Sequence, residues 1–287
     1  MTTNESLPNT ASSSEVSANE VFVDENSAVL YQLDNRGVAT VTLNRPDIHN
    51  AFDDQLIAEL TTIFQQIGQD DNVRVMILAS KGKSFCAGAD LNWMKRMADY
   101  SYEENLADAN ALAQMLLTLN ELPKPTIARV QGSAFGGAVG LIACCDMAIG
   151  SKLSKFCLSE VKLGLMPATI SPYVIDAIGA RAARRYFTTA EVFSSRRARR
   201  LGLLSEAVTE EELDQTVELL VTHLLKNAPK AVASAKQLVF DLRDTPAGKD
   251  LLDLTCERIA TARVSAEGQE GLSAFLQKRK ANWRGDE

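Results

Sequence analysis

The sequence of 287 residues contains no apolar run long enough to cross a membrane. The longest candidate, residues 132–149, is interrupted by glycines and contains Asp146, whereas a membrane span needs about 18 consecutive apolar residues. The N-terminal residues have neither the basic and apolar regions of a secretory signal nor the arginines of a mitochondrial transit segment. We therefore expect a cytoplasmic protein with no membrane partner.

Cysteine is scarce, and the five cysteines form no pattern that suggests a disulfide framework or a metal site. Their number is odd and no C-x-x-C pair occurs, although disulfide frameworks use paired cysteines and many zinc sites use that spacing. We expect reduced thiols and no bound metal.

Basic residues are outnumbered, because 30 Lys and Arg face 37 Asp and Glu, a net charge of −7. Residues 1–28 hold five of the acids and no base, so the rest of the chain carries 32 acids, 30 bases and a net charge of −2. A near-neutral body lacks the basic surface of a nucleic-acid-binding protein, and no such partner is expected. The polar composition of residues 1–28 predicts a disordered acidic leader, with a regulatory arm as the alternative.

Strands alternate with helices in the first part of the chain, and helices alone follow. Apolar patterns predict strands over residues 30–33, 38–43, 73–79, 126–130, 147–149 and 155–158. They predict helices over about 53–67, 90–97, 103–120, 137–145, 171–178, 180–187, 210–226, 229–242, 247–263 and 267–280. This order predicts an α/β fold, in which residues 29–205 form the core with the site and residues 206–287 form a helical C-terminal region.

Two turns rich in small residues, residues 84–90 and 131–140, each follow a predicted strand and precede a predicted helix. Backbone N–H groups at a helix start lack intrahelical acceptors, and small residues let the backbone approach a ligand closely. Together the turns could direct two N–H groups at one carbonyl oxygen, which would stabilise a thioester enolate. The second turn alone also fits an anion site or tight strand–helix packing.

Three segments resemble the crotonase (enoyl-CoA hydratase/isomerase) superfamily. They are residues 85–91 (FCAGADL), the glycine turn that ends in Cys145 and Asp146, and residues 156–167 (FCLSEVKLGLMP). Supporting matches lie in residues 43–52 and 270–280, so that the resemblance covers about residues 29–284 in the family's order. It implies a spiral of ββα units, a helical C-terminal trimerisation region, and a homotrimer or a dimer of trimers.

The resemblance also assigns roles to individual residues. It places the oxyanion-hole N–H groups at Ala89 and Gly137 and the catalytic acid or base at Glu160. The substrate is then an acyl-CoA thioester, so that coenzyme A enters with the substrate and no separate cofactor is expected. The further substrate-binding positions are Ala87, Gly88, Asp90, Leu91, Gly136, Gly140, Phe275 and Lys278, the last two acting in some family members on the neighbouring subunit.

One position departs from the pattern of hydratases with two glutamates, which carry an acid three residues after the oxyanion-hole glycine. Gly140 stands there, which leaves Glu160 as the one carboxylate and predicts a space open to water or to a bulkier acyl group. A single acid or base favours an isomerase on pattern alone.

The wider sequence around this position, residues 135–146 and 159–173, instead resembles bacterial methylglutaconyl-CoA hydratases of leucine degradation. We therefore expect hydration of 3-methylglutaconyl-CoA to 3-hydroxy-3-methylglutaryl-CoA. The alternatives are another enoyl-CoA hydratase, a Δ3,Δ2-enoyl-CoA isomerase with a single glutamate, and a non-catalytic CoA-binding or scaffold protein of the same fold.

Overall fold

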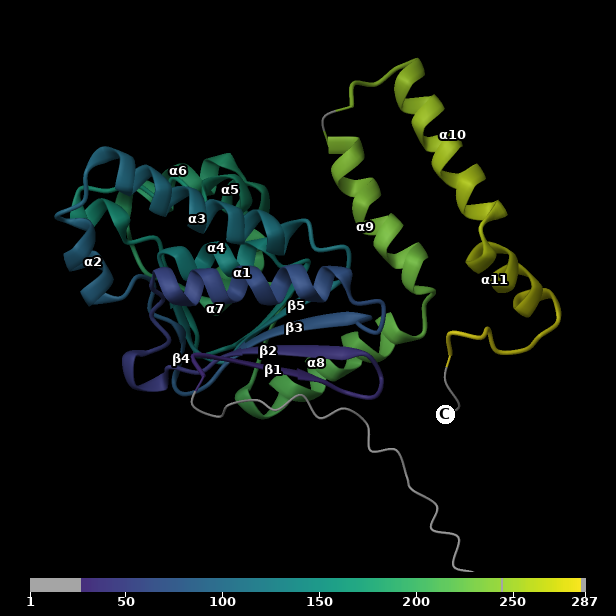
Figure 1. Ribbon diagram of the computed structural model, residues 1–287, viewed down its shortest axis with the longest axis horizontal. Helices are drawn as coiled ribbons and strands as arrows, with labels where there is room; N and C mark the ends of the chain where they lie inside the picture. Colours follow the sequence, from purple (N-terminus) through teal and green to yellow (C-terminus); the bar gives the residue numbers. More distant parts are fainter. Residues whose placement is uncertain (1–26, 244, 285–287) are drawn as a thin grey trace, which may run out of the picture.

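The computed structural model describes residues 27–243 and 245–284, which form two β-sheets and eleven α-helices (Figure 1). The predicted leader, residues 1–28, therefore lies almost wholly outside the described residues. Within the described part of the chain, no helix is both long and apolar enough to span a membrane.

The larger sheet has six strands in the order β1-β2-β3-β5-β7-β10. They are β1 (Val29–Leu33), β2 (Val38–Leu43), β3 (Val75–Ser80), β5 (Thr126–Val130), β7 (Met147–Ser151) and β10 (Glu206–Val208). β1 and β2 pair in antiparallel fashion, and all other neighbours are parallel. The α/β prediction is confirmed by this arrangement.

Helices cover both faces of the larger sheet, which explains why β3 is almost continuously apolar. On one face, α8 (Glu210–Leu225) packs Leu213, Val217 and Val221 against the strands. The other face is covered by α1 (Asp54–Gln69), on which α3 (Tyr102–Asn120) lies (Figure 1). Side-chain caps fix the start of each of these two helices, because Asp53 accepts a hydrogen bond from the Leu56 N–H and Ser101 forms a capping box with Glu104.

A second sheet consists of four short strands, of which the sequence predicts β8 (Lys155–Cys157) but not the other three. Its order is β4 (Ser84–Cys86), β6 (Ser133–Phe135), β8 and β9 (Phe193–Ser194). Each of the three strands that the sequence does not predict has only two or three residues, too few for an alternating pattern to be recognised. The prediction that helices alone follow Ser171 is wrong for the same reason, since β9 and β10 both lie beyond it.

The remaining helices of the body surround this second sheet. They are α2 (Leu91–Met97), α4 (Gly137–Cys144), α5 (Ser171–Ile178), α6 (Ala180–Thr189) and α7 (Ser195–Leu201). The sequence pattern does not predict α7, an arginine-rich helix of two turns.

The last three helices, α9 (Pro229–Arg243), α10 (Lys249–Val264) and α11 (Ala266–Leu276), stand beside the body (Figure 1). Helix α11 ends earlier than the predicted residue 280, because Lys278 adopts a left-handed backbone with φ of 54°. Lys236 of α9 reaches the body, where its Nζ lies 2.9 Å from the Asp146 carboxylate.

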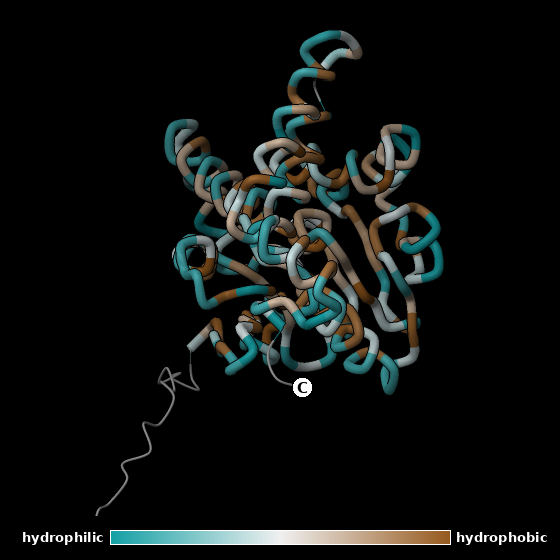
Figure 2. The backbone as a smooth tube through the Cα atoms, turned by 90° about the vertical axis from the view of Figure 1, so that its right-hand side faces the viewer, coloured by the Kyte–Doolittle hydropathy of each residue, from teal (hydrophilic) through white to brown (hydrophobic). Residues whose placement is uncertain are grey.

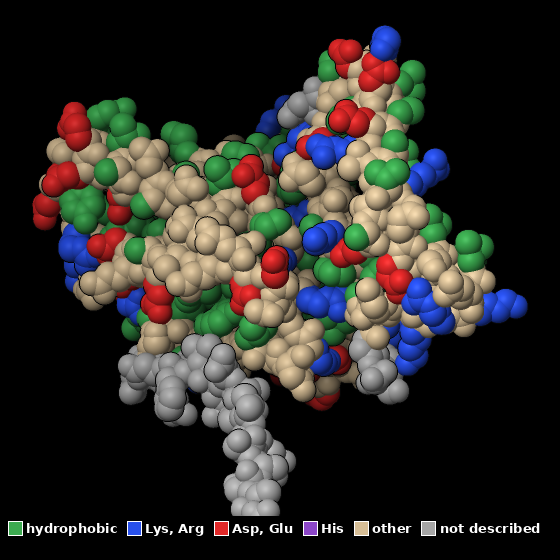
Figure 3. Space-filling model, turned by 45° about the vertical axis from the view of Figure 1, so that its right-hand side comes forward, with side chains coloured by type: hydrophobic (Ala, Val, Ile, Leu, Met, Phe, Trp, Pro, Cys, Tyr) green, Lys and Arg blue, Asp and Glu red, His purple; other side chains and the backbone are tan. Residues whose placement is uncertain are grey.

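These three helices expose many large apolar side chains. Hydrophobic and hydrophilic segments alternate along them (Figure 2), and green side chains project at several places among charged ones in the space-filling view (Figure 3). The exposed residues are Val239, Leu252, Ile259, Val264, Leu272, Phe275 and Leu276. Contiguous exposed apolar surface is typical of a protein–protein interface, although the predicted trimerisation stays a prediction.

A buried asparagine connects the loops that lead to the second sheet. The fully buried Asn50 side chain donates hydrogen bonds to the carbonyls of Lys81 (2.7 Å) and Ser84 (3.0 Å). It also accepts one from the N–H of Arg45 (2.9 Å). Its φ is 54°, a region that asparagine tolerates better than most residues. Asn50 therefore joins the loop after β2 to the loop that precedes β4.

Replacing Asn50 with Ala should lower the free energy of unfolding by about 2–4 kcal/mol, because each polar group left without a partner costs about 1–3 kcal/mol. Asn50→Gly loses the same hydrogen bonds but tolerates positive φ, so it should be less destabilised than Asn50→Ala. Urea denaturation at pH 7 measures both variants. A loss below about 1 kcal/mol in both would contradict this role for Asn50.

Candidate active site

The two small-residue turns lie side by side, because β4 and β6 pair in parallel and each leads into one of them. Gly88, in the first turn, has a φ of +91°. A Cβ atom added to Gly88 would lie 2.9 Å from the carbonyl oxygen of Phe135, at the end of β6. Only glycine therefore allows the two backbones to meet at this distance.

The N–H group of Ala89 points away from Phe52, the residue beside it. The Phe52 N–H donates to the Gly88 carbonyl (2.9 Å), and the Asp90 N–H donates to the Phe52 carbonyl (3.0 Å). Phe52 and Ala89 thus form an isolated parallel bridge, in which the polar groups of Ala89 itself face the opposite side. No described residue accepts a hydrogen bond from the Ala89 N–H.

The N–H group of Gly137 lies at the start of α4, where it has no intrahelical acceptor. The preceding N–H, that of Gly136, donates instead to the Cys157 carbonyl (2.8 Å). A Cβ atom at Gly137 would overlap the ring of Phe52, so this ring packs directly on the Gly137 backbone. Phe52 therefore contacts the residues that carry both outward-facing N–H groups.

The Glu160 carboxyl lies next to the second turn. Glu160 begins the short 3-10 helix η2 (Glu160–Leu163), which follows β8 in the same small sheet. A Cβ atom added to Gly136 would be 3.4 Å from the Glu160 Oε1 atom. The structure thus brings Glu160 together with Gly136, Gly137 and Ala89.

The carboxyl of Glu160 is poorly solvated. Its Oε2 atom is buried and has no hydrogen-bond partner among the described residues. Burial raises the pKa of Glu160, and a backbone hydrogen bond from its own N–H offsets part of that rise. A carboxyl with a raised pKa can take up and release a proton nearer to neutral pH. Beside two N–H donors, it suits proton transfer to a substrate whose carbonyl oxygen gains negative charge.

The space predicted beside Gly140 is not open. Gly140 is buried in α4, and a Cβ atom there would overlap Cγ2 of Ile170 and lie 2.7 Å from its Cβ. Ile170 is itself only 1% exposed. The prediction of room for water or for a bulkier acyl group at Gly140 is therefore wrong, because a branched side chain from the start of α5 fills that room. No sequence pattern links these two positions.

The other predicted residues of the first turn differ in their surroundings. Ala87 and Leu91 are exposed, Leu91 to 73%. The Asp90 carboxylate caps α2 by accepting hydrogen bonds from the N–H groups of Asn92 (2.7 Å) and Trp93 (3.2 Å). It also lies 3.8 Å from an Arg45 guanidinium nitrogen. The side chain of Asp90 thus has a structural role, in addition to any contact that its backbone makes.

An apolar surface that the sequence does not indicate as functional follows Glu160. Val161, Leu163, Leu165 and Met166 expose between 37% and 74% of their surface. This segment borders the carboxyl and could receive an apolar chain or a partner subunit. No three metal-ligating side chains gather in the described part of the chain.

Phe275 and Lys278 lie apart from this constellation. Phe275 is 81% exposed on α11, and Lys278 follows that helix. Helix α11 and helix α2, which begins at the first turn, are at opposite ends of the molecule (Figure 1). Within one chain, these two residues are therefore not brought to Glu160, and a role in a neighbouring subunit stays a prediction.

The chain is similar in sequence and in structure to several known proteins. The family model described as enoyl-CoA hydratase/isomerase matches residues 34–286. An enoyl-CoA hydratase of known structure from Shewanella pealeana is 47% identical, with a TM-score of 0.87 over 90% of this chain and 96% of that chain. An enoyl-CoA hydratase from Alternaria alternata is 35% identical over 86% of this chain and 81% of its own length. The 1,2-epoxyphenylacetyl-CoA isomerase of Escherichia coli is 31% identical over 87% and 96%.

The contact between Gly140 and Ile170 can be tested with a matched pair of helical glycines. Gly140→Ala should cost about 1–3 kcal/mol of stability through overpacking. Gly68→Ala in α1, where the added Cβ would make ordinary contacts of 3.5 Å or more, should instead stabilise by up to about 1 kcal/mol. Adding Ile170→Ala to Gly140→Ala should cost less than the sum of the single changes. Strict additivity in urea denaturation would contradict the contact.

The burial of Glu160 predicts a pH-dependent effect on stability. Because its pKa is raised in the folded chain, the stability tied to its protonated form is fully present below the unfolded pKa of about 4.3. That stability is lost as the pH rises through the folded pKa. Glu160→Gln, which stays neutral, should therefore gain stability relative to the wild type between pH 4 and pH 8. The exposed Glu210→Gln variant should show no such gain, and equal differences at both pH values for Glu160→Gln would rule out burial as the cause.

Proposed function

The chain belongs to the enoyl-CoA hydratase/isomerase family of the crotonase superfamily, and we propose that it adds water across the double bond of an enoyl-CoA. The observation that carries this proposal is the placement of Glu160 beside two turns whose Ala89 and Gly137 N–H groups face outward. These groups match what a thioester needs when charge develops on its oxygen and a proton moves on its acyl chain.

In the proposed reaction, the thioester oxygen accepts hydrogen bonds from the N–H groups of Ala89 and Gly137. Each donor would contribute about 3 kcal/mol of transition-state stabilisation. Glu160 takes a proton from a bound water as the water oxygen attacks the β-carbon, and the enolate charge passes to the thioester oxygen. Glu160, or a water bound to it, then returns a proton to the α-carbon. The partly buried carboxyl suits both roles because its raised pKa lets it change protonation state easily.

For the substrate we propose 3-methylglutaconyl-CoA, which would give 3-hydroxy-3-methylglutaryl-CoA. Support comes from the sequence likeness of residues 135–146 and 159–173 to methylglutaconyl-CoA hydratases.

Isomerisation of a 3-enoyl-CoA is the second candidate, favoured by one observation. Ile170 packs against Gly140, where a second acid would stand, and the Asp90 carboxylate caps α2, so that Glu160 is the described carboxyl left for proton transfer. A single carboxyl suffices to carry a proton between two carbons of the acyl chain.

We also propose that the chain works as a homotrimer or a dimer of trimers. The exposed apolar side chains of α9, α10 and α11 would be covered in such an assembly. Phe275 and Lys278 would then reach the coenzyme A of a neighbouring subunit, as other family members suggest.

The absorbance of the conjugated enoyl thioester separates these functions in one assay. Its loss with 3-methylglutaconyl-CoA or crotonyl-CoA reports hydration, and its gain with a 3-enoyl-CoA reports isomerisation. Glu160→Gln should reduce kcat by about 10²–10⁴ with little change in the affinity for acyl-CoA, whereas the exposed Glu210→Gln should leave turnover unchanged. Wild-type turnover in Glu160→Gln would overturn the proposed chemistry. Binding of acyl-CoA without turnover of any substrate would instead indicate a non-catalytic protein.

A further inference from the structure

A cavity of about 550 Å³ lies where the C-terminal helices join the body. Its volume is within the range of about 300–1,000 Å³ that is usual for small-molecule sites. We call it the hinge pocket. It is lined by Asn35, Arg36, Arg74, Thr222, Leu225, Lys226, Lys280, Asn282, Trp283 and Arg284.

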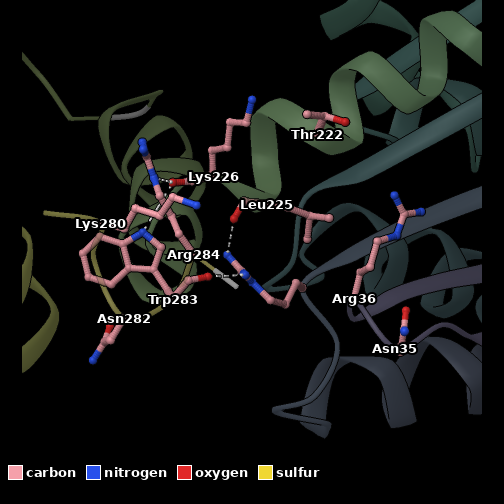
Figure 4. A pocket seen from close by; sticks show the side chains of 10 residues that line it. Asn35, Arg36, Thr222, Leu225, Lys226, Lys280, Asn282, Trp283 and Arg284 are labelled. Atoms are coloured by element: carbon pink, nitrogen blue, oxygen red, sulfur yellow. Dashed lines mark hydrogen bonds between the residues drawn. The ribbon is translucent and has the colours of Figure 1, made fainter. Parts of the chain in front are cut away.

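The hinge pocket is built from two parts of the chain that face each other. Asn35 and Arg36, from the turn between β1 and β2, lie on one side, and Trp283 and Lys280, from the segment after α11, lie on the other (Figure 4). None of the residues placed in the candidate active site lines it.

Half of the lining residues carry a positive charge, and no carboxylate of the described residues lines the pocket. Arg36 is compensated, because its guanidinium pairs with Asp34 (2.8 Å) and Glu218 (2.5 Å). The other four, Arg74, Lys226, Lys280 and Arg284, form no ion pair with any described residue. Lys and Arg side chains also gather along the boundary between the body and the C-terminal helices in Figure 3. A hollow lined by one sign of charge attracts ions of the opposite sign.

Among these four cations, the Arg74 guanidinium shows most clearly that the pocket lacks a counter-ion from the described residues. Its two terminal nitrogens donate to the carbonyls of Trp283 (3.1 Å), Leu225 (3.1 Å) and Asn227 (2.7 Å). These carbonyls carry no net charge, and the Arg74 Nε atom is buried with no partner among the described residues. The nearby Glu267 carboxylate accepts hydrogen bonds from the first N–H groups of α9. An anion in the pocket would compensate a guanidinium that is otherwise costly to bury.

Trp283 gives the pocket an aromatic wall among these cations. Its indole is held at one edge by Gly271, where an added Cβ would lie 3.1 Å from the ring, and at the other by a hydrogen bond of 3.4 Å from Nε1 to the Lys226 carbonyl. Aromatic rings beside basic side chains bind the base and the phosphates of nucleotides together.

We propose that the hinge pocket binds a nucleoside diphosphate or triphosphate, with its phosphates against Arg74, Lys226, Lys280 and Arg284 and its base against Trp283. Because these residues come from both sides of the hinge, the ligand would hold the C-terminal segment on the body. It would thereby favour the placement of α9, α10 and α11 seen in this structure. The proposal does not depend on the proposed catalytic residues.

Isothermal titration of the full-length protein with ADP tests the proposal. Lys280→Ala combined with Arg284→Ala removes two exposed cations and should weaken ADP binding about tenfold or more. Arg196→Ala combined with Arg200→Ala, which removes two exposed cations of α7, should leave it unchanged. Unaltered ADP affinity in the first double variant would overturn the proposal, because ADP would then occupy another site, such as the one for coenzyme A. Lys226→Glu provides a second variant, in which ADP binding should be lost.

Tripolyphosphate separates a nucleotide from a simple phosphate ligand. Trp283→Leu should weaken the binding of ADP and leave that of tripolyphosphate unchanged. If tripolyphosphate binds the wild type as tightly as ADP does and Trp283→Leu affects neither, the nucleotide assignment is wrong.

Discussion

The parallel pairing of β4 with β6 is the contact on which the candidate site depends. These strands are only three residues long, yet their pairing sets the two small-residue turns beside each other. On the other edge of β6, its pairing with β8 places Glu160 next to the second turn. The approach requires the absence of side chains, since a Cβ at Gly132 would overlap the carbonyl of Lys83 just before β4. Phe52 completes the arrangement by hydrogen-bonding to one turn and packing its ring against the other.

Five of the six strands of the larger sheet could be predicted from the sequence because they have local signals, whereas the three-residue β10 was missed. The structure gives β2 and β5 the predicted bounds. In the smaller sheet only β8 has such a signal, and β4, β6 and β9 could not be predicted in this way. Its strands gain their hydrogen bonds only from partners far along the chain, such as Ala134 with Phe156, and three residues carry too little pattern of their own. Thus the part of the fold that positions the chemistry is the part with the weakest local signal.

In the candidate site, too, some features could be inferred from the sequence and others depend on contacts between distant segments. Glu160, Ala89 and Gly137 were assigned by a resemblance, and the structure describes the surroundings in which such roles are possible. The raised pKa of Glu160 comes from burial, which is a tertiary effect and has no counterpart in the residues next to it. Phe52 and Ile170 were not recognised as parts of the site, because their contacts with Gly137 and Gly140 connect segments that are distant in the sequence.

The packing of Ile170 on Gly140 also constrains how this chain can evolve. A carboxylate introduced at position 140 by a single substitution would be destabilising, since the new side chain would overlap the isoleucine. Position 170 would have to become smaller beforehand, and that intermediate would carry a cavity in a well-packed region. The two positions are therefore epistatic, with one order of change far more accessible than the other. A related chain that carries an acid at position 140 should therefore also carry a residue smaller than isoleucine at position 170.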